Sequence, residues 1–271
     1  MGSFKNYLEV PIRGNKERMG GVILEIRKLS NYFGMVCTAR DLDLDIESGV
    51  LTSIIGPNGA GKSTLINLIT GNLPVQSGTI RFRGQNVTHL PIHQRVRLGI
   101  CRSFQIVNIF PELTVLENIM IPTLALSGRA TRIFSPVSGE RAALKQVDTL
   151  LEKVGLGGVR TTPAKALSHG DQRLLEVAVA LAVKPALLFL DEPTAGMNPV
   201  ERVKVLENIR QLSREGQTTF VLVEHDMDVV FSLSERVIVL HRGELLGDGT
   251  PEEIKQNEKV REVYLGDSIT E

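Results

Sequence analysis

The chain has 271 residues, 42% of them hydrophobic, and 31 Lys and Arg residues balance 31 Asp and Glu residues. This length and composition predict a globular protein with one large core or two small ones, and the zero net charge gives no global attraction to nucleic acid or anionic lipid, so no nucleic-acid partner is expected. The longest apolar run, Val177 to Leu190, is interrupted by Lys184 and Pro185 and is shorter than the roughly 20 apolar residues that cross a membrane.

Residues 1–20 are mixed polar and basic and lack an apolar segment. They predict a loose N-terminal extension without a secretory signal. Cys37 and Cys101 lie far apart in the sequence without metal-ligand spacing, which fits a reducing compartment.

The next part predicts strands on both sides of a glycine-rich loop. Within the strand-like stretch from Leu24 to Ile46, residues 41–46 alternate polar and apolar side chains, which is typical of an antiparallel layer with one buried face. Val50 to Ile55 predicts a buried strand that enters the loop. Lys62 to Thr70 predicts the helix that leaves it.

A helical region follows two further predicted strands, Gly78 to Phe82 and Cys101 to Gln105. Thr114 and Glu117 form a capping-box pattern at the head of a helix over residues 115–126. A later helix from about Gly139 has an apolar stripe formed by Leu144, Val147, Leu151 and Val154.

The C-terminal half alternates strands and helices. Leu187 to Leu190 predicts a buried strand, and Asn198 caps a helix with Pro199 at its first position. Strands at residues 218–223 and 237–240 flank a helix that starts at Asp226, which indicates a parallel α/β core. The predicted apolar stripe of the helix after Asn198 is Val203, Leu206, Ile209 and Leu212, and Gly216 closes that helix.

The loop itself matches the pattern G-x-x-x-x-G-K-[ST] between a strand and a helix, which is the context that this pattern requires. Backbone N–H groups at such a helix start surround a polyphosphate, Lys62 reaches the terminal phosphates, and Ser63 holds Mg²⁺. The sequence therefore predicts a site for a nucleoside triphosphate and Mg²⁺. The predicted loop residues are Gly56, Pro57, Asn58, Gly59, Ala60, Gly61, Lys62, Ser63 and Thr64.

Two carboxylates follow the buried strand that ends at Leu190. Asp191 is delivered to the carboxyl edge of the sheet, where ligands gather in α/β proteins, and is predicted to hold Mg²⁺. Glu192 is predicted to polarise the attacking water as a general base. Upstream, Ser168 and Gly170 begin a helix whose exposed N–H groups predict an anion site, although an ordinary capped helix explains the same pattern when it is read alone.

Together these motifs resemble the ATP-binding cassette (ABC) family over the chain from about Gly21. Gly56 to Thr64 matches its Walker A motif, residues 187–191 its Walker B motif, Leu167 to Asp171 its signature, and residues 195–198 its D-loop. The resemblance implies a single ABC ATPase domain over residues 21–271. Its fold is a P-loop NTPase (RecA-like) α/β core with an antiparallel β layer and an α-helical subdomain inserted at about residues 110–170.

Three further residues take roles from the same resemblance. Gln105 matches the glutamine loop that senses Mg²⁺ and the membrane partner, and His225 matches the switch histidine that contacts the γ-phosphate. Phe33 matches the aromatic that stacks on adenine, although Tyr32 beside it serves equally well. The region from Gln105 to Ile121 is expected to face the membrane permease, because an apolar group follows Gln105 where an ordinary loop would be polar. The group consists of Ile106, Val107, Ile109 and Phe110, and the alternative is that these side chains pack under the helical insertion.

The chain also departs from the family pattern. His169 replaces the usual glycine and Asp171 the usual glutamine of the signature. A carboxylate near a phosphate-binding helix start repels phosphate unless it turns away, so Ser168 and Gly170 are the expected contacts there. The sequences at 167–176, 110–119, 195–199 and 263–266 are similar to ATP-binding subunits of importers for branched-chain amino acids and related amides.

The family resemblance implies a cytoplasmic ATPase bound to the inner face of the plasma membrane. It implies ATP and ADP as ligands, Mg²⁺ as cofactor, a second cassette in a homodimer or heterodimer, integral-membrane permeases, and indirectly an extracellular or periplasmic solute-binding protein. Alternatives are a soluble ABC ATPase without a transporter, an importer of urea or amides, and a small-molecule kinase. The kinase would leave the signature, Gln105 and His225 unused.

Overall fold

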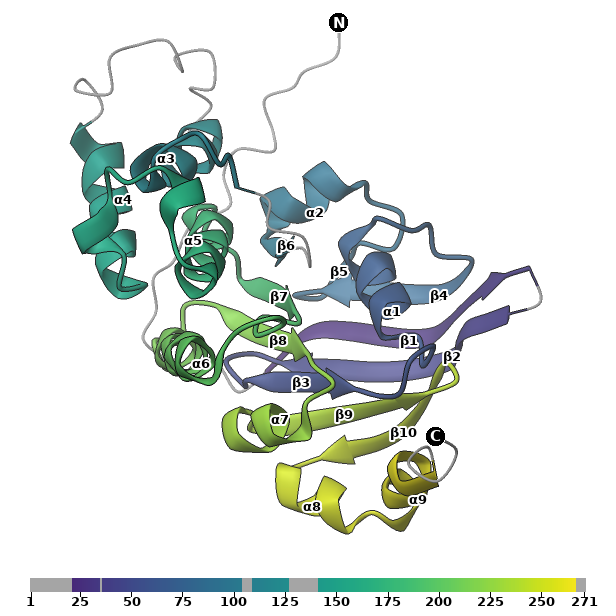
Figure 1. Ribbon diagram of the computed structural model, residues 1–271. Coiled ribbons are helices and arrows are strands. Elements are labelled where there is room, and N and C mark those ends of the chain that lie inside the picture. Colours follow the sequence, from purple (N-terminus) through teal and green to yellow (C-terminus); the bar gives the residue numbers. More distant parts are fainter. Residues whose placement is uncertain (1–20, 35, 104–108, 127–140, 267–271) are drawn as a thin grey trace, which may run out of the picture.

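The computed structural model describes residues 21–34, 36–103, 109–126 and 141–266. Two sheets form its framework, a four-stranded one with the order β2-β1-β4-β5 and a six-stranded one with the order β10-β9-β3-β8-β7-β6 (Figure 1). The strands are β1 (Val22–Phe33), β2 (Val36–Glu47), β3 (Thr52–Ile55), β4 (Ser77–Phe82), β5 (Gln85–Asn86), β6 (Ile100–Arg102), β7 (Leu187–Asp191), β8 (Thr219–Val223), β9 (Arg236–His241) and β10 (Glu244–Gly249).

The four-stranded sheet is the predicted antiparallel layer. β1 pairs antiparallel with both β2 and β4. In β2 the apolar residues Leu42, Leu44 and Ile46 are buried, whereas Asp41 and Asp43 between them are exposed. This alternation confirms the period-two pattern and gives the layer one face for the core.

The six-stranded sheet is parallel from β9 to β6, and only the edge strand β10 runs antiparallel to its neighbour among the described strands. The carboxyl ends of β3, β7 and β8 therefore meet at one edge of the sheet. The predicted phosphate loop follows β3, and Asp191 ends β7, so the topology brings both motifs to that edge.

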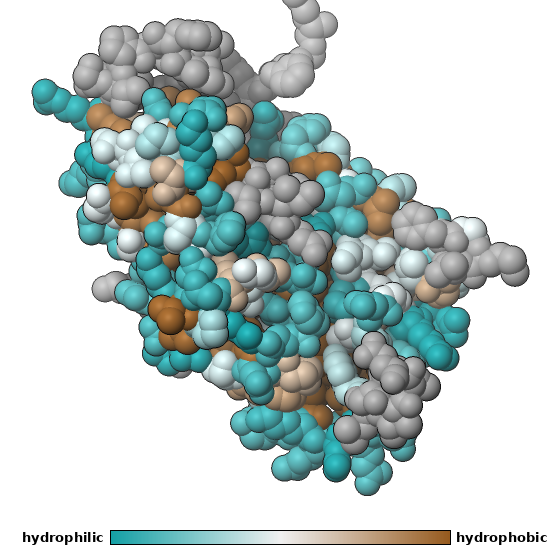
Figure 2. Space-filling model, in the orientation of Figure 1, coloured by the Kyte–Doolittle hydropathy of each residue, from teal (hydrophilic) through white to brown (hydrophobic). Residues whose placement is uncertain are grey.

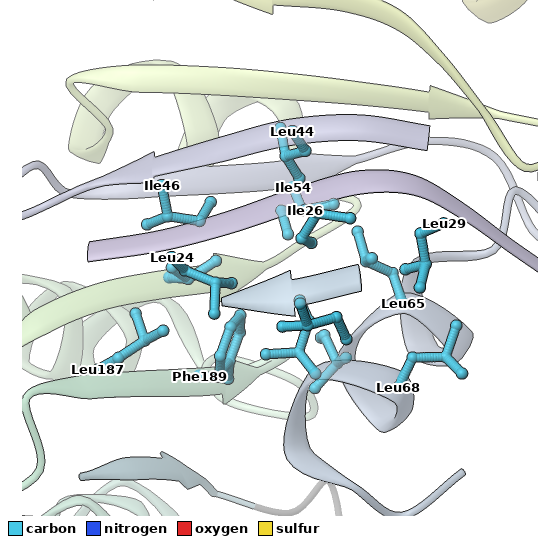
Figure 3. Close-up of a cluster of buried hydrophobic side chains, with 14 of the residues drawn as sticks. Leu24, Ile26, Leu29, Leu44, Ile46, Ile54, Leu65, Leu68, Leu187 and Phe189 are labelled. Carbon is cyan, nitrogen blue, oxygen red and sulfur yellow. The ribbon is translucent and has the colours of Figure 1, made fainter. Parts of the chain in front are cut away.

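The side chains of β7 alternate between two hydrophobic cores. Leu187 and Phe189 pack with the antiparallel layer and α1, as Figure 3 shows for the cluster around Leu24, Ile26 and Leu65. Leu188 and Leu190 pack instead with α3, α4, α5 and α6 on the opposite side of the sheet. A strand with both faces buried reads as a continuous apolar run, which explains its sequence.

Helices cover the two sheets, and α3 contacts both α4 and α5 in one layer. The helices are α1 (Lys62–Thr70), α2 (Ile92–Leu98), α3 (Val115–Leu126), α4 (Arg141–Lys153), α5 (His169–Ala182), α6 (Pro199–Arg214), α7 (Met227–Leu233), α8 (Pro251–Gln256) and α9 (Glu258–Gly266), with short 3₁₀ turns η3 (Gly157–Val159) and η4 (Ala164–Ala166). Of the helices in the described ranges, none is long and apolar enough to cross a membrane.

The predicted helix starts are confirmed by side-chain hydrogen bonds. Thr114 and Glu117 exchange the two bonds of a capping box at the head of α3. The Asn198 side chain accepts the N–H groups of Val200 and Glu201, with Pro199 at the first position of α6.

The predicted apolar stripe of α6 is wrong at its first member. Val203 is 55% exposed, whereas Val205, Ile209 and Leu212 are buried. Positions 205, 209 and 212 are four and three residues apart and share one face of the helix, and Val203 lies outside that face.

Candidate active site

The Gly56–Thr64 loop is shaped by glycines at positions where other residues do not fit. Gly61 precedes α1 with a φ of +100°, and a Cβ atom there would lie 2.3 Å from the backbone O of Thr38. A Cβ atom on Gly56 would lie 2.2 Å from the backbone O of Leu240. The loop is therefore packed directly against the backbone of β2 and β9, and its start of α1 has no side-chain cap. Uncapped N–H groups at a helix start are suited to phosphate oxygens.

Lys62 reaches back over the loop. Its Nζ donates to the backbone O atoms of Gly56 at 2.6 Å and Pro57 at 3.0 Å. Burial lowers the pKa of Lys62, and the charges of Glu192 and Asp191 oppose that effect. The lysine ammonium thus bonds to the loop and interacts electrostatically with the two carboxylates at the same sheet edge.

Asp191 lies at the end of β7 and is 3% exposed. Its Oδ2 is 2.5 Å from Nη2 of Arg102, the last residue of β6. Its backbone O accepts a hydrogen bond from Arg173 of α5, and Arg173 also forms a buried ion pair with Glu176. The end of β7 is therefore connected to the neighbouring strand and to α5 through two guanidinium groups.

Glu192 and His225 face each other across β7 and β8. The Nδ1 of His225 lies 3.7 Å from Oε1 of Glu192. Glu192 has a φ of +43°, an uncommon conformation for a side-chain-bearing residue, and its N–H donates to the O of Val223 at 2.9 Å. Backbone strain of this kind is concentrated at functional sites.

Glu224 is a buried acid next to His225. It is 2% exposed and accepts a hydrogen bond from the Thr194 hydroxyl at 3.1 Å. Burial raises the pKa of Glu224, and the Thr194 bond and the His225 charge partly offset the rise. Glu224 therefore connects the end of β8 to the segment after β7, and the negative charge of Glu192 adds to the rise of its pKa.

Ser168 is confirmed as the N-cap of α5, since its Oγ accepts the N–H of Asp171 at 3.1 Å. Ser168 and His169 are exposed, and Gly170 is buried beside Glu201 of α6, whose Oε1 accepts the Gly170 N–H at 3.4 Å. A Cβ atom on Gly170 would lie 3.1 Å from the Glu201 side chain, which would have to shift by a few tenths of an ångström to admit it.

The Asp171 carboxylate turns toward α6. Its Oδ1 lies 2.6 Å from Nζ of Lys204. This ion pair neutralises the acidic residue that the signature carries in place of glutamine, and so it reduces repulsion of an anion at the helix start.

Some predicted site residues lie outside the described part of the chain. Gln105, Ile106 and Val107 fall in residues 104–108, and nothing is described of the Phe33 side chain, although Phe33 ends β1. Tyr32 is 45% exposed. Ile109 is partly buried against the core of the helical layer, whereas Phe110 is 55% exposed.

No role was predicted for Arg102, Asn67, Glu224 or Lys204. Arg102 bonds to Asp191 and to Asn67, Glu224 accepts from Thr194, and Lys204 pairs with Asp171. Arg102 ends an otherwise apolar strand three residues before Gln105. A charged side chain at that position could have indicated a site residue. The position of Lys204 opposite Asp171 depends on how α6 packs beside α5, which no local pattern encodes.

The chain is similar to proteins of known family and fold. Residues 39–195 match the family model described as ABC transporter, and residues 244–269 match the model described as branched-chain amino acid ATP-binding cassette transporter. The high-affinity branched-chain amino acid transport ATP-binding protein LivG of Escherichia coli is 38% identical over 255 residues, covering 92% of this chain and 100% of LivG.

Solved structures agree with that similarity. An ATP-binding cassette of an ABC transporter in its ADP conformation (MJ1267) superposes with a TM-score of 0.81 at 31% identity, covering 91% of this chain and 99% of that one. The dimeric bacterial ABC transporter cassette MJ0796 gives a TM-score of 0.69 at 26% identity over 84% of this chain and 98% of that one.

Proposed function

The chain belongs to the ABC transporter family, and we propose that it is the ATP-hydrolysing subunit of an importer for a small solute, with branched-chain amino acids as the first candidates. The similarity to LivG over 92% of the chain supports this substrate class. The C-terminal match of residues 244–269 to the branched-chain amino acid model supports it independently of the nucleotide motifs.

The phosphate half of the site is assigned to the loop between β3 and α1. Lys62 and the N–H groups of residues 59–64 bind the β- and γ-phosphates. The aromatic ring of Tyr32 or of Phe33, at the end of β1, stacks on adenine. The uncapped start of α1 and the glycine geometry at Gly61 support this assignment.

The residues present fit a magnesium ion. Ser63 offers a hydroxyl in the first turn of α1, and Asp191 offers a carboxylate at the end of β7. Oxygen donors of this kind, completed by phosphate oxygens and water, are what Mg²⁺ prefers. We assign Ser63 and Asp191, with Gln105, to hold the cation, which neutralises phosphate charge when bound.

Glu192 is assigned as the general base. Its carboxylate can take a proton from the water that attacks the γ-phosphate, and His225, 3.7 Å away, orients that carboxylate and contacts the phosphate. The strained backbone of Glu192 supports a catalytic position, because the fold maintains it at a cost.

The signature half of the site is assigned to a second cassette. Ser168 lies exposed at the start of α5, where the Gly170 N–H donates to Glu201 of α6, whereas the phosphate loop is packed against β2 and β9. We propose that two cassettes pair head to tail, so that ATP on the loop of one meets Ser168 and Gly170 of the other. The dimeric state of the related MJ0796 cassette supports this arrangement.

A mixing experiment tests the composite site. Lys62→Ala and Ser168→Arg homodimers each lack one half of every site, so the ATPase rate of either variant alone should fall by about 100-fold or more. A mixed dimer regains one intact site, made from the loop of the Ser168 variant and the signature of the Lys62 variant. The mixture should hydrolyse ATP faster than the sum of the two separate variants.

Controls make the result decisive. Glu192→Gln should bind ATP, lose hydrolysis and accumulate as an ATP-dependent dimer, measured by size-exclusion chromatography with light scattering. If mixed dimers form and no activity returns, Ser168 is an ordinary helix cap. Normal hydrolysis by Glu192→Gln would remove Glu192 as the base.

We further assign the permease-facing surface to the region from Gln105 to Ile121. Phe110 is 55% exposed on a loop that Asn118 holds to α3 by hydrogen bonds in both directions. Figure 2 shows apolar atoms over the helical layer of α3 to α5 at the upper left. Exposed apolar groups on a fixed loop are typical of a partner site. Phe110→Glu should abolish uptake of labelled leucine while leaving ATPase activity unchanged, and a loss of both with normal folding would contradict the assignment.

A further inference from the structure

Arg102 links the two elements that carry the assigned cation ligands. Its Nη2 lies 2.5 Å from Oδ2 of Asp191 on β7, and its Nη1 lies 2.5 Å from Oδ1 of Asn67 on α1. Asn67 is four residues after Ser63, so the two side chains lie on the same face of α1 one turn apart. One guanidinium therefore bridges the strand that bears Asp191 and the helix that bears Ser63.

This network is almost closed to solvent. The side chains of Arg102 and Asp191 are 11% and 5% exposed. The guanidinium therefore places a positive charge in direct contact with a carboxylate that is closed off from water. The bond geometry is that of a charge-assisted hydrogen bond, which is about twice as strong as a neutral one.

The same contact has an electrostatic consequence for a divalent cation. A cation held by Asp191 would share its carboxylate with the guanidinium, and two positive groups on one carboxylate repel each other through a low-dielectric interior. Arg102 therefore weakens cation binding at Asp191 while it keeps the carboxylate in place before the cation arrives.

We propose that Arg102 is a positioning residue of the metal site that holds Asp191 in the absence of a cation and competes with the cation for that carboxylate. This inference rests on the proposed role of Asp191 in the ATPase. Arg102 then determines how strongly nucleotide affinity depends on Mg²⁺, and this role is separate from any contribution of Arg102 to folding.

The test measures the dissociation constant of ADP by calorimetry, once in EDTA and once in saturating Mg²⁺. The quantity compared is the constant in EDTA divided by the constant in Mg²⁺. ADP is not hydrolysed, and the association of free ADP with Mg²⁺ is identical for every variant, so it cancels when ratios are compared. In Arg102→Gln the ratio should rise by about tenfold, because one repelling charge is removed at close range. Arg102→Lys retains the charge, and its ratio should stay within about twofold of the parent.

Arg97→Gln is the matched control. Arg97 is exposed on α2, and its substitution changes the net charge of the chain by the same amount. Its ratio should equal that of the parent. If the ratio of Arg102→Gln is unchanged or lower while its affinity in EDTA shows an intact site, Arg102 is purely structural and the proposal is wrong.

A second measurement needs no neutral variant and covers the case in which Arg102→Gln does not fold. In parent protein with labelled arginine, the Arg102 guanidinium gives the protected NMR signal that is absent from Arg102→Lys. This signal should shift when Mg²⁺ is added to the ADP complex. A signal that Mg²⁺ does not move would overturn the proposal. A parent protein whose ADP affinity does not respond to Mg²⁺ would instead refute the assigned cation role of Asp191.

Discussion

The loop at residues 56–64 and the start of α5 form the two halves of the proposed nucleotide site, and they are held in different ways. The loop is fixed by backbone contact, since Gly56 and Gly61 approach carbonyl groups of β9 and β2 too closely for any side chain. The start of α5 is fixed by charged side chains, through Arg173 to the end of β7 and through Glu201 and Lys204 to α6.

This difference indicates what each half can do. A loop held by backbone contacts has its phosphate-binding geometry before nucleotide arrives, and no side-chain rotation alters it. A helix start held by ion pairs can be retuned by single charge changes, and it presents its hydroxyl on the surface, where a second cassette can reach it.

The largest effect is expected in the loop. Gly61→Ala puts a Cβ atom 2.3 Å from a backbone oxygen at a φ of +100°, so it should lower unfolding free energy by about 3 kcal/mol and remove ADP binding. Gly59→Ala is the control, because Gly59 has a φ of +78° but no atom within 4 Å of the added Cβ, and backbone strain alone should cost about 1 kcal/mol. Urea denaturation measures both. Equal costs would show that close packing does not fix the loop.

A comparable loss of stability is expected at α5, but here a second substitution should restore it. Arg173→Met leaves the buried Glu176 carboxylate without this cation and should lower unfolding free energy by about 3 kcal/mol. Because the cause is charge, the double variant Arg173→Met, Glu176→Met should recover most of the loss. Denaturant melts of the two variants check this, and a double variant as unstable as the single one would mean that the lost hydrogen bond from Arg173 to the backbone O of Asp191, rather than the charge of Glu176, causes the loss.

The smallest effect is expected at the surface of α5. Lys204→Met removes an ion pair whose members are 52% and 23% exposed, so folding stability should change by at most about 1 kcal/mol. In the Glu192→Gln background, the uncompensated Asp171 should weaken the ATP-dependent dimer by about fivefold, and adding Asp171→Asn should restore it. Sedimentation measures the dimer constant. No weakening in Lys204→Met would show that Asp171 does not act on the phosphate side of α5.

The sequence predicted most of the fold because the decisive patterns are local. The glycine spacing around Lys62, the Thr114 and Glu117 capping box and the buried run before Asp191 each depend on neighbours a few residues away. The stripe of α6 failed at Val203, because which of two adjacent faces is buried depends on the neighbouring helix rather than on apolar content.

Site residues that act across elements were not predictable in the same way. Arg102 meets Asp191 across a sequence separation of 89 and Lys204 meets Asp171 across a separation of 33, so the contacts arise only when β6, β7, α5 and α6 are packed. The departures at His169 and Asp171 were visible in the sequence, but the partner that neutralises Asp171 was not.

The alternation along β7 has a consequence for folding cooperativity. Leu187 and Phe189 complete the core beneath the antiparallel layer, while Leu188 and Leu190 complete the core beneath the helices. Neither core can separate from the sheet without exposing side chains of the same strand, so the two layers melt as a single unit. The amide hydrogens of β7 and its neighbour β8 should therefore exchange with solvent only through global unfolding, and the proposed catalytic pair, Glu192 and His225, lies just beyond the ends of these two strands.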